Sequence, residues 1–456
     1  MEAVALEDLL EQRIADRSAR IAVMGLGYVG LPLSLLLVGG GFDVVGYDVN
    51  SAYAERLCGG RSTVVDVPDA ALRAALETKR LAPTADPNAL RGADIYVICV
   101  PTPLSKTRQP DLSCIDAALR TLLTVWGPGK LVVLESTTYP GTTDEVLLPA
   151  LCADGTWALD RDFLLAFSPE RVDPGNAAHP LPTIPKVVGG VSAASGRTAA
   201  RLYGTVFDRV HPVSGARAAE LTKLLENTFR NVNIALINEF AQICDTLGVD
   251  VWEVVDAAKT KPFGFMPFYP GPGIGGHCIP LDPQYLVYRA RLSGYEPRLV
   301  ALADQINQGM PAYVARQAME ALNQRGMAIK GAKLLAVGVT YKPDVPDLRE
   351  SPALPVIREL RRLGADVAYV DPYVPELTLD GVPVSRAELT AEVVDAADLV
   401  VVLTAHQVVD HGLLAEALGK TLDTRRAVAR VLADRERLQP KQETTALAPS
   451  AVGRAL

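Results

Sequence analysis

Short apolar runs alternate with helix-period segments over the first two hundred residues of the chain. From Arg20 onward the apolar runs are IAVMG, FDVVGYD, DIYVICVP, KLVVLEST and FLLAFSP, and a helical pattern follows the first of them through Leu37. The runs are almost continuously apolar, as strands buried on both faces are. Strands that alternate with helices in this way predict a parallel sheet covered by helices.

The pattern changes to long helical segments between about Ala216 and Asn323. The longest, AAELTKLLENTFRNVNIALINEFAQICDTLG, has no proline and ends at Gly248, as a helix with a glycine C-cap would. We expect a long helix that joins two lobes. A glycine- and proline-rich loop, KPFGFMPFYPGPGIGGHCIP, interrupts this region, and irregular loops inside a helical domain are usually functional.

After Lys330 the rhythm of strands and helices returns with AKLLAVGVTY, VIRELRRLG, ADVAYVDP and DLVVVLTAH, which predicts a second, smaller α/β domain. Beyond about Arg430 the periodicity fades into PKQETTALAPSAVGRAL, a composition typical of a mobile tail. The expected fold class is therefore α/β, with two Rossmann-like, doubly wound parallel-sheet domains joined by a long central helix. The expected boundaries are 1–215, 216–323 and 324–430, followed by a tail at 431–456.

Composition narrows the class of protein. A chain of 456 residues, 49% of them hydrophobic, is too long for one core. The net charge of -8 argues against nucleic acid or a membrane as partner, because both need a basic patch. No apolar stretch reaches the roughly 18 residues of a membrane helix, and the N-terminus lacks the apolar core of a signal peptide. The six cysteines have no metal-binding spacing, so we expect reduced thiols, no metal site and a cytoplasmic location.

The first apolar run leads into Gly25-Leu-Gly27-Tyr28-Val29-Gly30 and then a helix, the setting of a dinucleotide fingerprint. The first glycine permits a tight turn, the second lets a pyrophosphate approach the backbone, and the third lets the helix pack on the strand. Asp48 ends the next run, where a carboxylate would accept hydrogen bonds from ribose hydroxyls and disfavour a 2′-phosphate. The pattern predicts NAD rather than NADP.

Other polar residues lie where ligands bind in such sheets or in the irregular loop. Thr102 and Thr137 follow two further strands, and both cofactor contact and ordinary hydroxyl capping account for them. Cys278 could approach a bound ligand in its flexible loop, or it could be an inert thiol. Asp282 follows four residues later and could hold a water beside the thiol if the segment turns helically. His277 is adjacent in sequence, so its side chain is expected to point away from the cysteine and to be structural or a minor ligand contact.

The long helix carries a polar stripe. Lys223 and Asn227 are four residues apart and share a face with Arg230. A solvated face is one explanation. The flanking side chains Leu221, Leu224, Leu225 and Phe229 instead predict a largely buried helix, in which a polar stripe needs partners and a ligand is one candidate. Glu170 in FSPERVDPG is a further acid at the end of a strand.

Taken together, these segments resemble the UDP-sugar 6-dehydrogenase family over about Ile21 to Arg425. The resemblance rests on GLGYVGLPL, VPTPL, ESTTYPGTT, SPERVDPG, ELTKLLENTFRNVNIALINE, PGPGIGGHCIPLDP and TYKPDVPDLRESPAL, in that order. SPERVDPG and the loop before Cys278 are most similar to the branch that acts on UDP-N-acetylhexosamines, above all UDP-N-acetyl-D-glucosamine. One departure is Tyr53, where the family often has Lys or Arg five residues after the ribose-binding acid.

The resemblance implies an NAD-binding first domain, a catalytic loop in the helical connector and a third domain that binds the UDP-sugar. It implies covalent catalysis by Cys278, proton transfer or oxyanion stabilisation by Lys223 with Asn227, and water activation by Asp282 and Glu170. Sugar or nucleotide contacts are expected from Arg171, Val172, Lys223, Asn227, Arg230, Gly275, Tyr341, Lys342 and Arg425. Arg349 is expected to reach the cofactor in a homodimer or higher homo-oligomer, and the product is expected to serve polysaccharide biosynthesis.

The implied chemistry explains these residue types. Oxidation of an alcohol to an acid removes four electrons and each NAD accepts two, so two NAD are needed per substrate. A thiolate that adds to the intermediate aldehyde gives a thiohemiacetal, whose oxidation leaves a thioester for water to cleave. N-acetylmannosamine, N-acetylgalactosamine and glucose remain alternative sugars. A hydroxyacid or 6-phosphogluconate-type dehydrogenase would not need the thiol, and a non-catalytic nucleotide-sugar sensor would have no use for a nucleophile.

Overall fold

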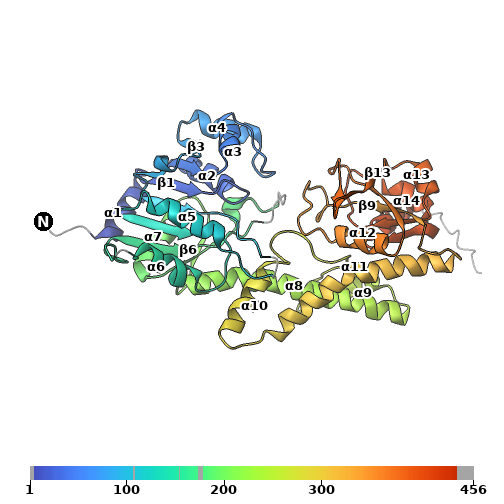
Figure 1. Cartoon of the computed structure of the whole chain (residues 1–456). Helices are drawn as coiled ribbons and strands as arrows, with labels where there is room; N and C mark the ends of the chain where they lie inside the picture. The colour runs from blue at the N-terminus through green and yellow to red at the C-terminus, as the bar shows by residue number, and fades with distance from the viewer. Residues whose placement is uncertain (1–4, 106–107, 154, 173–177, 439–456) are drawn as a thin grey trace, which may run out of the picture. The chain divides into compact units, whose positions relative to one another are not determined.

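The computed structural model describes residues 5–105, 108–153, 155–172 and 178–438 (Figure 1). These residues form two compact units. The first comprises the chain through Leu236 together with His277–Gln305, and the second comprises Ile237–Gly276 and the chain from Ile306 onward. The long helix α8 (Ala216–Leu247) and helix α11 (Arg298–Gln324) each have residues in both units.

The first unit is built on one sheet in which the strands lie in the order β3-β2-β1-β4-β5-β6-β7-β8. Their bounds are β1 (Arg20–Met24), β2 (Asp43–Tyr47), β3 (Leu81–Thr84), β4 (Ile95–Ile98), β5 (Lys130–Leu134), β6 (Phe163–Phe167), β7 (Lys186–Gly190) and β8 (Val210–Pro212). The neighbours pair in parallel, as predicted, except β6 and β7, which are antiparallel. A parallel return needs a crossover helix, and the described part of this connection holds only the short helix η3 (Leu181–Thr183).

Alternate residues of the strands enter two cores, one on each face of this sheet. Ile21 and Val23 of β1 pack on one face, and Ala22 and Met24 pack on the other. Helices α1, α2, α3, α4 and α7 contribute to the first core, and α5 and α6 to the second. The helices of this unit are α1 (Leu6–Ala15), α2 (Gly30–Gly39), α3 (Ser51–Cys58), α4 (Asp69–Glu77), η1 (Pro87–Leu90), α5 (Ser113–Leu123), η2 (Thr143–Leu147), α6 (Leu148–Leu151), α7 (Ala193–Tyr203) and α10 (Asp282–Leu292).

The second unit has a parallel sheet in the order β13-β10-β9-β14-β15, also with a core on each face. Its strands are β9 (Lys333–Val337), β10 (Asp366–Val370), β13 (Ser385–Arg386), β14 (Leu399–Val402) and β15 (Thr421–Asp423), and β11 (Thr378–Leu379) pairs with β12 (Val382–Pro383). Its helices are α9 (Val251–Ala258), α12 (Ala353–Arg362), α13 (Ala391–Ala396), α14 (His411–Glu416), η4 (Leu418–Lys420) and α15 (Ala427–Leu438). Helix α15 continues into the expected tail, and 439–456 lie outside the described residues. The doubly wound α/β fold is thus confirmed in both units.

Helix α8 ends as the sequence predicts and is less buried than predicted. Gly248 has a φ of +69°, and the amide of Val249 donates to the carbonyl of Cys244, which closes the helix in a Schellman motif. The expectation of a largely buried helix was wrong for Leu221, Leu225 and Phe229, which are exposed, whereas Leu224 is fully buried. Leucine and phenylalanine indicate burial on average, but a helix can also carry them on an outward stripe.

Among the described helices, none combines the length and the apolar character that crossing a bilayer requires.

Candidate active site

The loop after β1 has the geometry of a dinucleotide-binding turn. Gly25 has a φ of +95°, and a Cβ there would lie 2.8 Å from a neighbouring carbonyl oxygen. A Cβ on Gly30 would lie 1.9 Å from the carbonyl oxygen of Gly25. At Gly27 no atom beyond the glycine and its neighbours in the chain lies within 4 Å of the corresponding position, which leaves this backbone open to a phosphate. Tyr28 and Val29 lead into α2, whose N-terminal amides can receive it, so the loop fits NAD.

Asp48 follows β2 and is tied to the same loop. Its Oδ2 accepts from the amide of Leu26 at 3.1 Å, and its Oδ1 accepts from the amide of Asn50 at 3.0 Å. The carboxylate is thereby held where ribose hydroxyls are expected. Tyr53, in place of the family's Lys or Arg, donates its hydroxyl to the carbonyl of Leu26 at 2.9 Å. This residue therefore braces the cofactor loop with a neutral group.

Thr102 and Thr137 lie together, as their positions at neighbouring strand ends predict. The Thr102 hydroxyl donates to the carbonyl of Thr137 at 2.5 Å, and the carbonyl of Thr102 accepts from the hydroxyl of Tyr285 on α10. Burial raises the pKa of Tyr285, so its hydroxyl remains a donor at neutral pH. Contact of the two threonines with the cofactor remains a prediction.

The structure joins Asp282 to Cys278 by a helical turn and to Asn227 of α8 by a side-chain hydrogen bond. The carbonyl of Cys278 accepts from the amide of Asp282 at 2.8 Å, so the helical turn expected at this point is present. The Asn227 Nδ2 donates to the Asp282 Oδ2 at 2.5 Å. Both of these side chains are buried. Burial raises the pKa of Asp282 to about 6, although nearby Lys223 and the Asn227 hydrogen bond favour the carboxylate.

Lys223 is buried one turn before Asn227 and donates to the carbonyl of Glu170 at 2.6 Å. The thiol of Cys278 lies close enough to Lys223 and Asp282 for their charges to shift its pKa. Burial and the charge of Asp282 raise the pKa of Cys278 to about 11, while Lys223 and Arg230 oppose the increase. The thiol is consequently protonated at neutral pH in the substrate-free protein.

His277 contradicts its predicted orientation. Its Nδ1 lies 3.0 Å from the Cys278 Sγ and 3.3 Å from the Tyr28 hydroxyl. The imidazole stacks on the Tyr28 ring with 4.4 Å between centroids. The expectation that adjacent side chains diverge holds for regular helices and strands, but this irregular loop turns both side chains toward one point.

Of the remaining predicted residues of the first unit, Arg171 and Val172 contact Glu170, and Arg230 lies near Cys278. The Glu170 Oε1 accepts from the amides of Arg171 and Val172 at 2.6 and 2.8 Å. The Arg171 guanidinium pairs with Glu226 at 2.6 Å. Arg230 is an exposed residue of α8 whose charge reaches Cys278. The motif SPERVDPG continues into residues 173–175, which lie outside the described ranges.

A buried ionic cluster behind Glu170 escaped the sequence analysis. The Lys186 Nζ lies 3.0 Å from a Glu135 carboxylate oxygen and 3.3 Å from one of Glu170, and the Tyr203 hydroxyl donates to Glu135. Burial raises the pKa of Glu135 despite the lysine, and the two carboxylates raise the pKa of Lys186 despite its burial. Glu135 and Glu170 follow β5 and β6, and Lys186 begins β7. Their ion pairs therefore hold together the strand ends that lead into the site.

Glu220 on α8 is a second residue that was missed. Its carboxylate accepts from the amides of Gly141 and Thr143 at 2.6 and 2.9 Å and from the Thr143 hydroxyl at 2.7 Å. Burial nevertheless raises the pKa of Glu220 to about 7. These bonds tie α8 to the loop that carries Thr137. In the sequence Glu220 looks like any charged helix residue, because its partners lie far away along the chain.

The second unit gathers several predicted nucleotide contacts. A Cβ on Gly275 would lie 2.7 Å from the Cβ of Tyr341, so this approach requires glycine. The carbonyl of Arg349 accepts from the amide of Gly276, and its guanidinium pairs with Asp347. The carbonyl of Lys342 accepts from the hydroxyl of Thr340 at 3.0 Å, and the Arg425 Nε donates to the carbonyl of Leu403 at 2.8 Å. Desolvation lowers the pKa of Arg425 to about 10, which leaves it cationic at neutral pH.

A buried pair braces the loop after β9 that carries Tyr341. The His406 Nε2 lies 2.9 Å from the Asp371 Oδ2, which also accepts from the amide of Val339 at 2.7 Å. The His406 Nδ1 faces the amide of Asp344 at 3.0 Å, so that nitrogen accepts and the Nε2 carries the proton. Asp371 follows β10 and His406 follows β14, and a polar residue after a strand end is the feature of the sequence that could have identified them.

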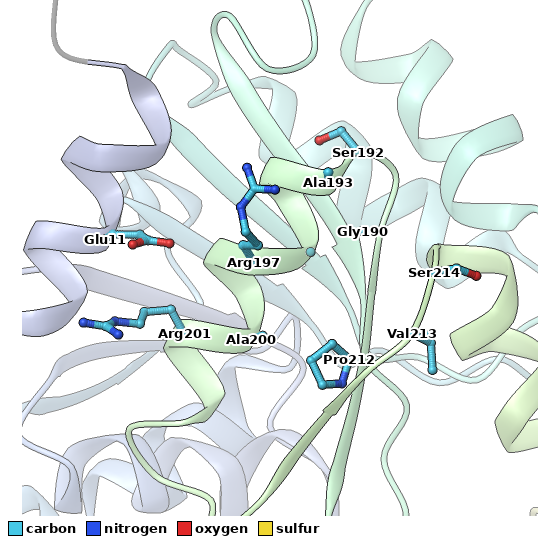
Figure 2. Close-up of a pocket in the computed structure, with 11 residues that line it drawn as sticks. Glu11, Gly190, Ser192, Ala193, Arg197, Ala200, Arg201, Pro212, Val213 and Ser214 are labelled. Carbon is cyan, nitrogen blue, oxygen red and sulfur yellow. The ribbon is translucent and has the colours of Figure 1, made fainter.

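A separate hollow of about 410 Å³ opens on the first unit between α1, α7 and the segment after β8 (Figure 2). It is lined by Glu11, Arg197, Arg201, Ser192 and Pro212 among others, and Arg197 pairs with Glu7 at 2.7 Å. None of the predicted site residues lines it. Within the part of the chain that the structure describes, no group of three His, Cys, Asp or Glu side chains is arranged to hold a metal ion.

Comparison with known proteins gives the family. The models of the UDP-glucose/GDP-mannose dehydrogenase family match residues 19–207 as the NAD binding domain, 217–309 as the central domain and 335–430 as the UDP binding domain. The chain is 37% identical over 359 residues to UDP-N-acetyl-D-glucosamine 6-dehydrogenase of Pseudomonas aeruginosa, which covers 78% of this chain and 84% of that protein.

Two further relatives carry other sugars in their names. An NDP-N-acetyl-D-galactosaminuronic acid dehydrogenase of Ralstonia nicotianae is 36% identical over 425 residues, covering 91% of this chain and 95% of that one. The solved structure of a UDP-D-ManNAc dehydrogenase from Pyrococcus horikoshii superposes with a TM-score of 0.81 and 36% identity, covering 90% of this chain and 96% of the other. The chain belongs to the UDP-glucose/GDP-mannose dehydrogenase family and is an NAD-dependent UDP-sugar dehydrogenase.

Proposed function

We propose that the protein oxidises C6 of UDP-N-acetyl-D-glucosamine from the alcohol to the carboxylate through a thioester on Cys278. The observation that carries the proposal is the cluster in the first unit. Cys278 lies within reach of the charge of Lys223, and the carboxylate of Asp282 is bonded to Asn227. These groups supply a nucleophile, a cation and a base in one partly enclosed place.

Each residue of this cluster has a chemical task in the proposal. NAD, held by the Gly25–Gly30 loop and Asp48, supplies a two-electron acceptor for each of the two oxidations. The Cys278 sulfur adds to the aldehyde and later carries the acyl group. Lys223 and Asn227 stabilise the negative charge on the substrate oxygen. Asp282 as carboxylate takes a proton from the water that cleaves the thioester.

The other predicted residues have supporting tasks. Glu170 anchors Lys223 through its carbonyl and can assist the attacking water. Arg171, Val172 and Arg230 contact the sugar or phosphate. Gly275, Tyr341, Lys342 and Arg425 hold the nucleotide, so that binding far from the reacting carbon orients that carbon. Thr102 and Thr137 contact the cofactor, and Arg349 contacts the cofactor of a neighbouring subunit.

The sugar is the finer part of the proposal. SPERVDPG, the loop before Cys278 and the name of the Pseudomonas aeruginosa relative favour N-acetylglucosamine. The names of the other two relatives keep the manno and galacto epimers as alternatives. Glucose is less favoured by these motifs. Polysaccharide biosynthesis consumes such uronic acids, and we place the enzyme in the cytoplasm, where its six free cysteines stay reduced.

A panel of UDP-sugars tests the proposal. The purified protein is incubated with NAD and one of UDP-N-acetylglucosamine, its manno and galacto epimers, or UDP-glucose, and NADH yield and product mass are recorded. We expect the highest kcat/KM with UDP-N-acetylglucosamine, two NADH per sugar and a product of uronic-acid mass. A higher kcat/KM with another sugar would refute the substrate assignment, and one NADH per sugar would refute the reaction.

We also propose that the protein is a homodimer or a higher homo-oligomer. Helix α8 exposes an apolar stripe of large side chains, which comprises Leu221, Leu225, Phe229, Leu236, Phe240, Ile243 and Leu247. The spacing of three, four or seven residues keeps these side chains on one face of the helix. A second copy of the same stripe is self-complementary, as a two-fold interface requires.

A further inference from the structure

Cys278 needs a proton acceptor before it can act as a nucleophile. Burial and the charge of Asp282 keep its thiol protonated at neutral pH, and only the thiolate adds efficiently to a carbonyl. Some group within hydrogen-bonding reach of the sulfur must therefore take the proton as the bond to carbon forms. The mechanism proposed above leaves this acceptor unassigned.

The ionisable groups around the sulfur can be compared by geometry. Lys223 donates its Nζ to the carbonyl of Glu170 at 2.6 Å, and the guanidinium of Arg230 has no acceptor nitrogen. Asp282 is bonded to Asn227 at 2.5 Å and is assigned to the water of the later hydrolysis. The His277 Nδ1 lies 3.0 Å from the sulfur, which is the distance that direct proton transfer requires.

Tyr28 holds the imidazole in this position. Its ring stacks on that of His277 with an interplanar angle of 22°, and its hydroxyl lies 3.3 Å from the same Nδ1. Tyr28 belongs to the loop that receives the cofactor. The base, its support and the nucleophile thus come from two segments of the first unit, which are the β1–α2 loop and the turn before α10.

We infer that His277 is the general base for Cys278, with Tyr28 as its positioning residue. The inference rests on the proposed thioester function. As the sulfur adds to C6 of the aldehyde, the S–H bond breaks, the proton moves to Nδ1, and the carbonyl electron pair moves to oxygen beside Lys223. The C6–H bond then breaks, its hydrogen leaves with both electrons as a hydride to NAD, and the thioester remains. When water cleaves the thioester, the departing thiolate regains its proton from the imidazolium, so His277 ends the cycle neutral.

The test measures the thiol and the two oxidations separately. Alkylation of Cys278 by iodoacetamide is followed on its own peptide by mass spectrometry from pH 5.5 to 9.5, because other cysteines also react. In the unmodified protein the rate should rise with pH through a step well below the pKa of about 11 of the thiol itself. His277→Gln should remove this step and slow alkylation at pH 7.5 by about tenfold or more.

In steady-state assays, His277→Gln should slow the second oxidation by about 100-fold, the low end for loss of a general base. A burst of one NADH per active site, from the first oxidation, should remain. When semicarbazide is added to trap the aldehyde, the yield should be one NADH per sugar. Free imidazole should restore turnover to His277→Ala, which a purely structural defect would not allow. Tyr28→Phe, which keeps the stacked ring, should retain the alkylation step.

Cys278→Ala, assayed in parallel, separates the two proposals. If this variant still forms two NADH per sugar, the thioester function itself is refuted. If Cys278→Ala is inactive while His277→Gln keeps both the alkylation step and two NADH at the normal rate, only the role of His277 is refuted. Loss of the NADH burst in His277→Gln would also overturn the inference, because the base would then be needed before the thiol acts.

Discussion

Replacing Lys186 by methionine should destabilise the first unit in a pH-dependent way. The side chains of Lys186, Glu135 and Glu170 are 3%, 0% and 10% exposed, so the substitution removes the cation from two enclosed carboxylates. Breaking a buried ion pair by removing one partner costs about 3–5 kcal/mol. For a domain of this size the expected decrease in Tm is about 2–4 °C per kcal/mol, or roughly 10 °C in total.

The sign of the pH dependence follows from Glu135. Burial already raises its pKa, and loss of the lysine raises it further. The folded variant then holds a proton that the unfolded chain releases near its ordinary pKa, so stability decreases as pH rises between these two values. The loss amounts to at most about 1.4 kcal/mol per pH unit. The difference between Lys186→Met and the unmodified protein should therefore be larger at pH 8.5 than at pH 5.5.

Thermal unfolding followed by tryptophan fluorescence can measure this difference, because Trp126 lies in the first unit and packs on Phe163. The matched control is Lys186→Met with Glu135→Gln, which removes one of the two carboxylates and should recover a large part of the lost stability. Equal melting of Lys186→Met and the unmodified protein at both pH values would show that the cluster is not an obligatory ion pair. A decrease in Tm that is the same at both pH values would refute the assignment of the proton to Glu135.

Three further outcomes are expected. Asp48→Ala should weaken the preference for NAD over NADP by about tenfold or more, since we expect the carboxylate to accept from the ribose hydroxyls; equal kcat/KM with both cofactors in the unmodified protein would contradict this. Turnover limited by thioester hydrolysis should decrease below about pH 6 as Asp282 takes up a proton, and burst kinetics with Asp282→Asn should lose this pH dependence. Leu225→Glu should place a charge in the α8 stripe and dissociate the oligomer in light scattering at micromolar concentration, whereas Asp245→Asn, an exposed position on another face of the same helix, is the control; an unchanged mass for Leu225→Glu would exclude the stripe as interface.

Much of the fold could be predicted from local patterns. Continuous apolar runs such as IAVMG and KLVVLEST identify β1 and β5, because strands covered on both faces have no polar alternation. The antiparallel pairing of β6 and β7 could not be predicted, because it depends on the path of the intervening chain. The exposure of the α8 stripe could not be predicted either, because an apolar helix face has the same spacing whether it packs on a core or on another subunit.

The site was predicted only in part. Motifs of the sequence contain Cys278, Asp282 and Asn227. The spacing of Cys278 and Asp282 predicted a shared helical turn, and the spacing of Lys223 and Asn227 predicted a shared helix face. Lys186 and Glu135 stand 51 residues apart and look like ordinary strand-end charges until the sheet brings them together. The orientation of the His277 side chain was predicted wrongly, because it depends on an irregular loop in which sequence spacing does not determine where side chains point.

The central claim is that Cys278 carries the substrate covalently, and the mass of the intact Cys278→Ser variant tests it most directly. A serine can still add to the aldehyde, but the resulting ester hydrolyses far more slowly than a thioester. With UDP-N-acetylglucosamine and NAD, we predict that Cys278→Ser gains the mass of one acyl-linked nucleotide sugar, while Cys278→Ala gains none and both lose steady-state turnover. Normal turnover in both variants, with two NADH per substrate and no adduct, would contradict the account.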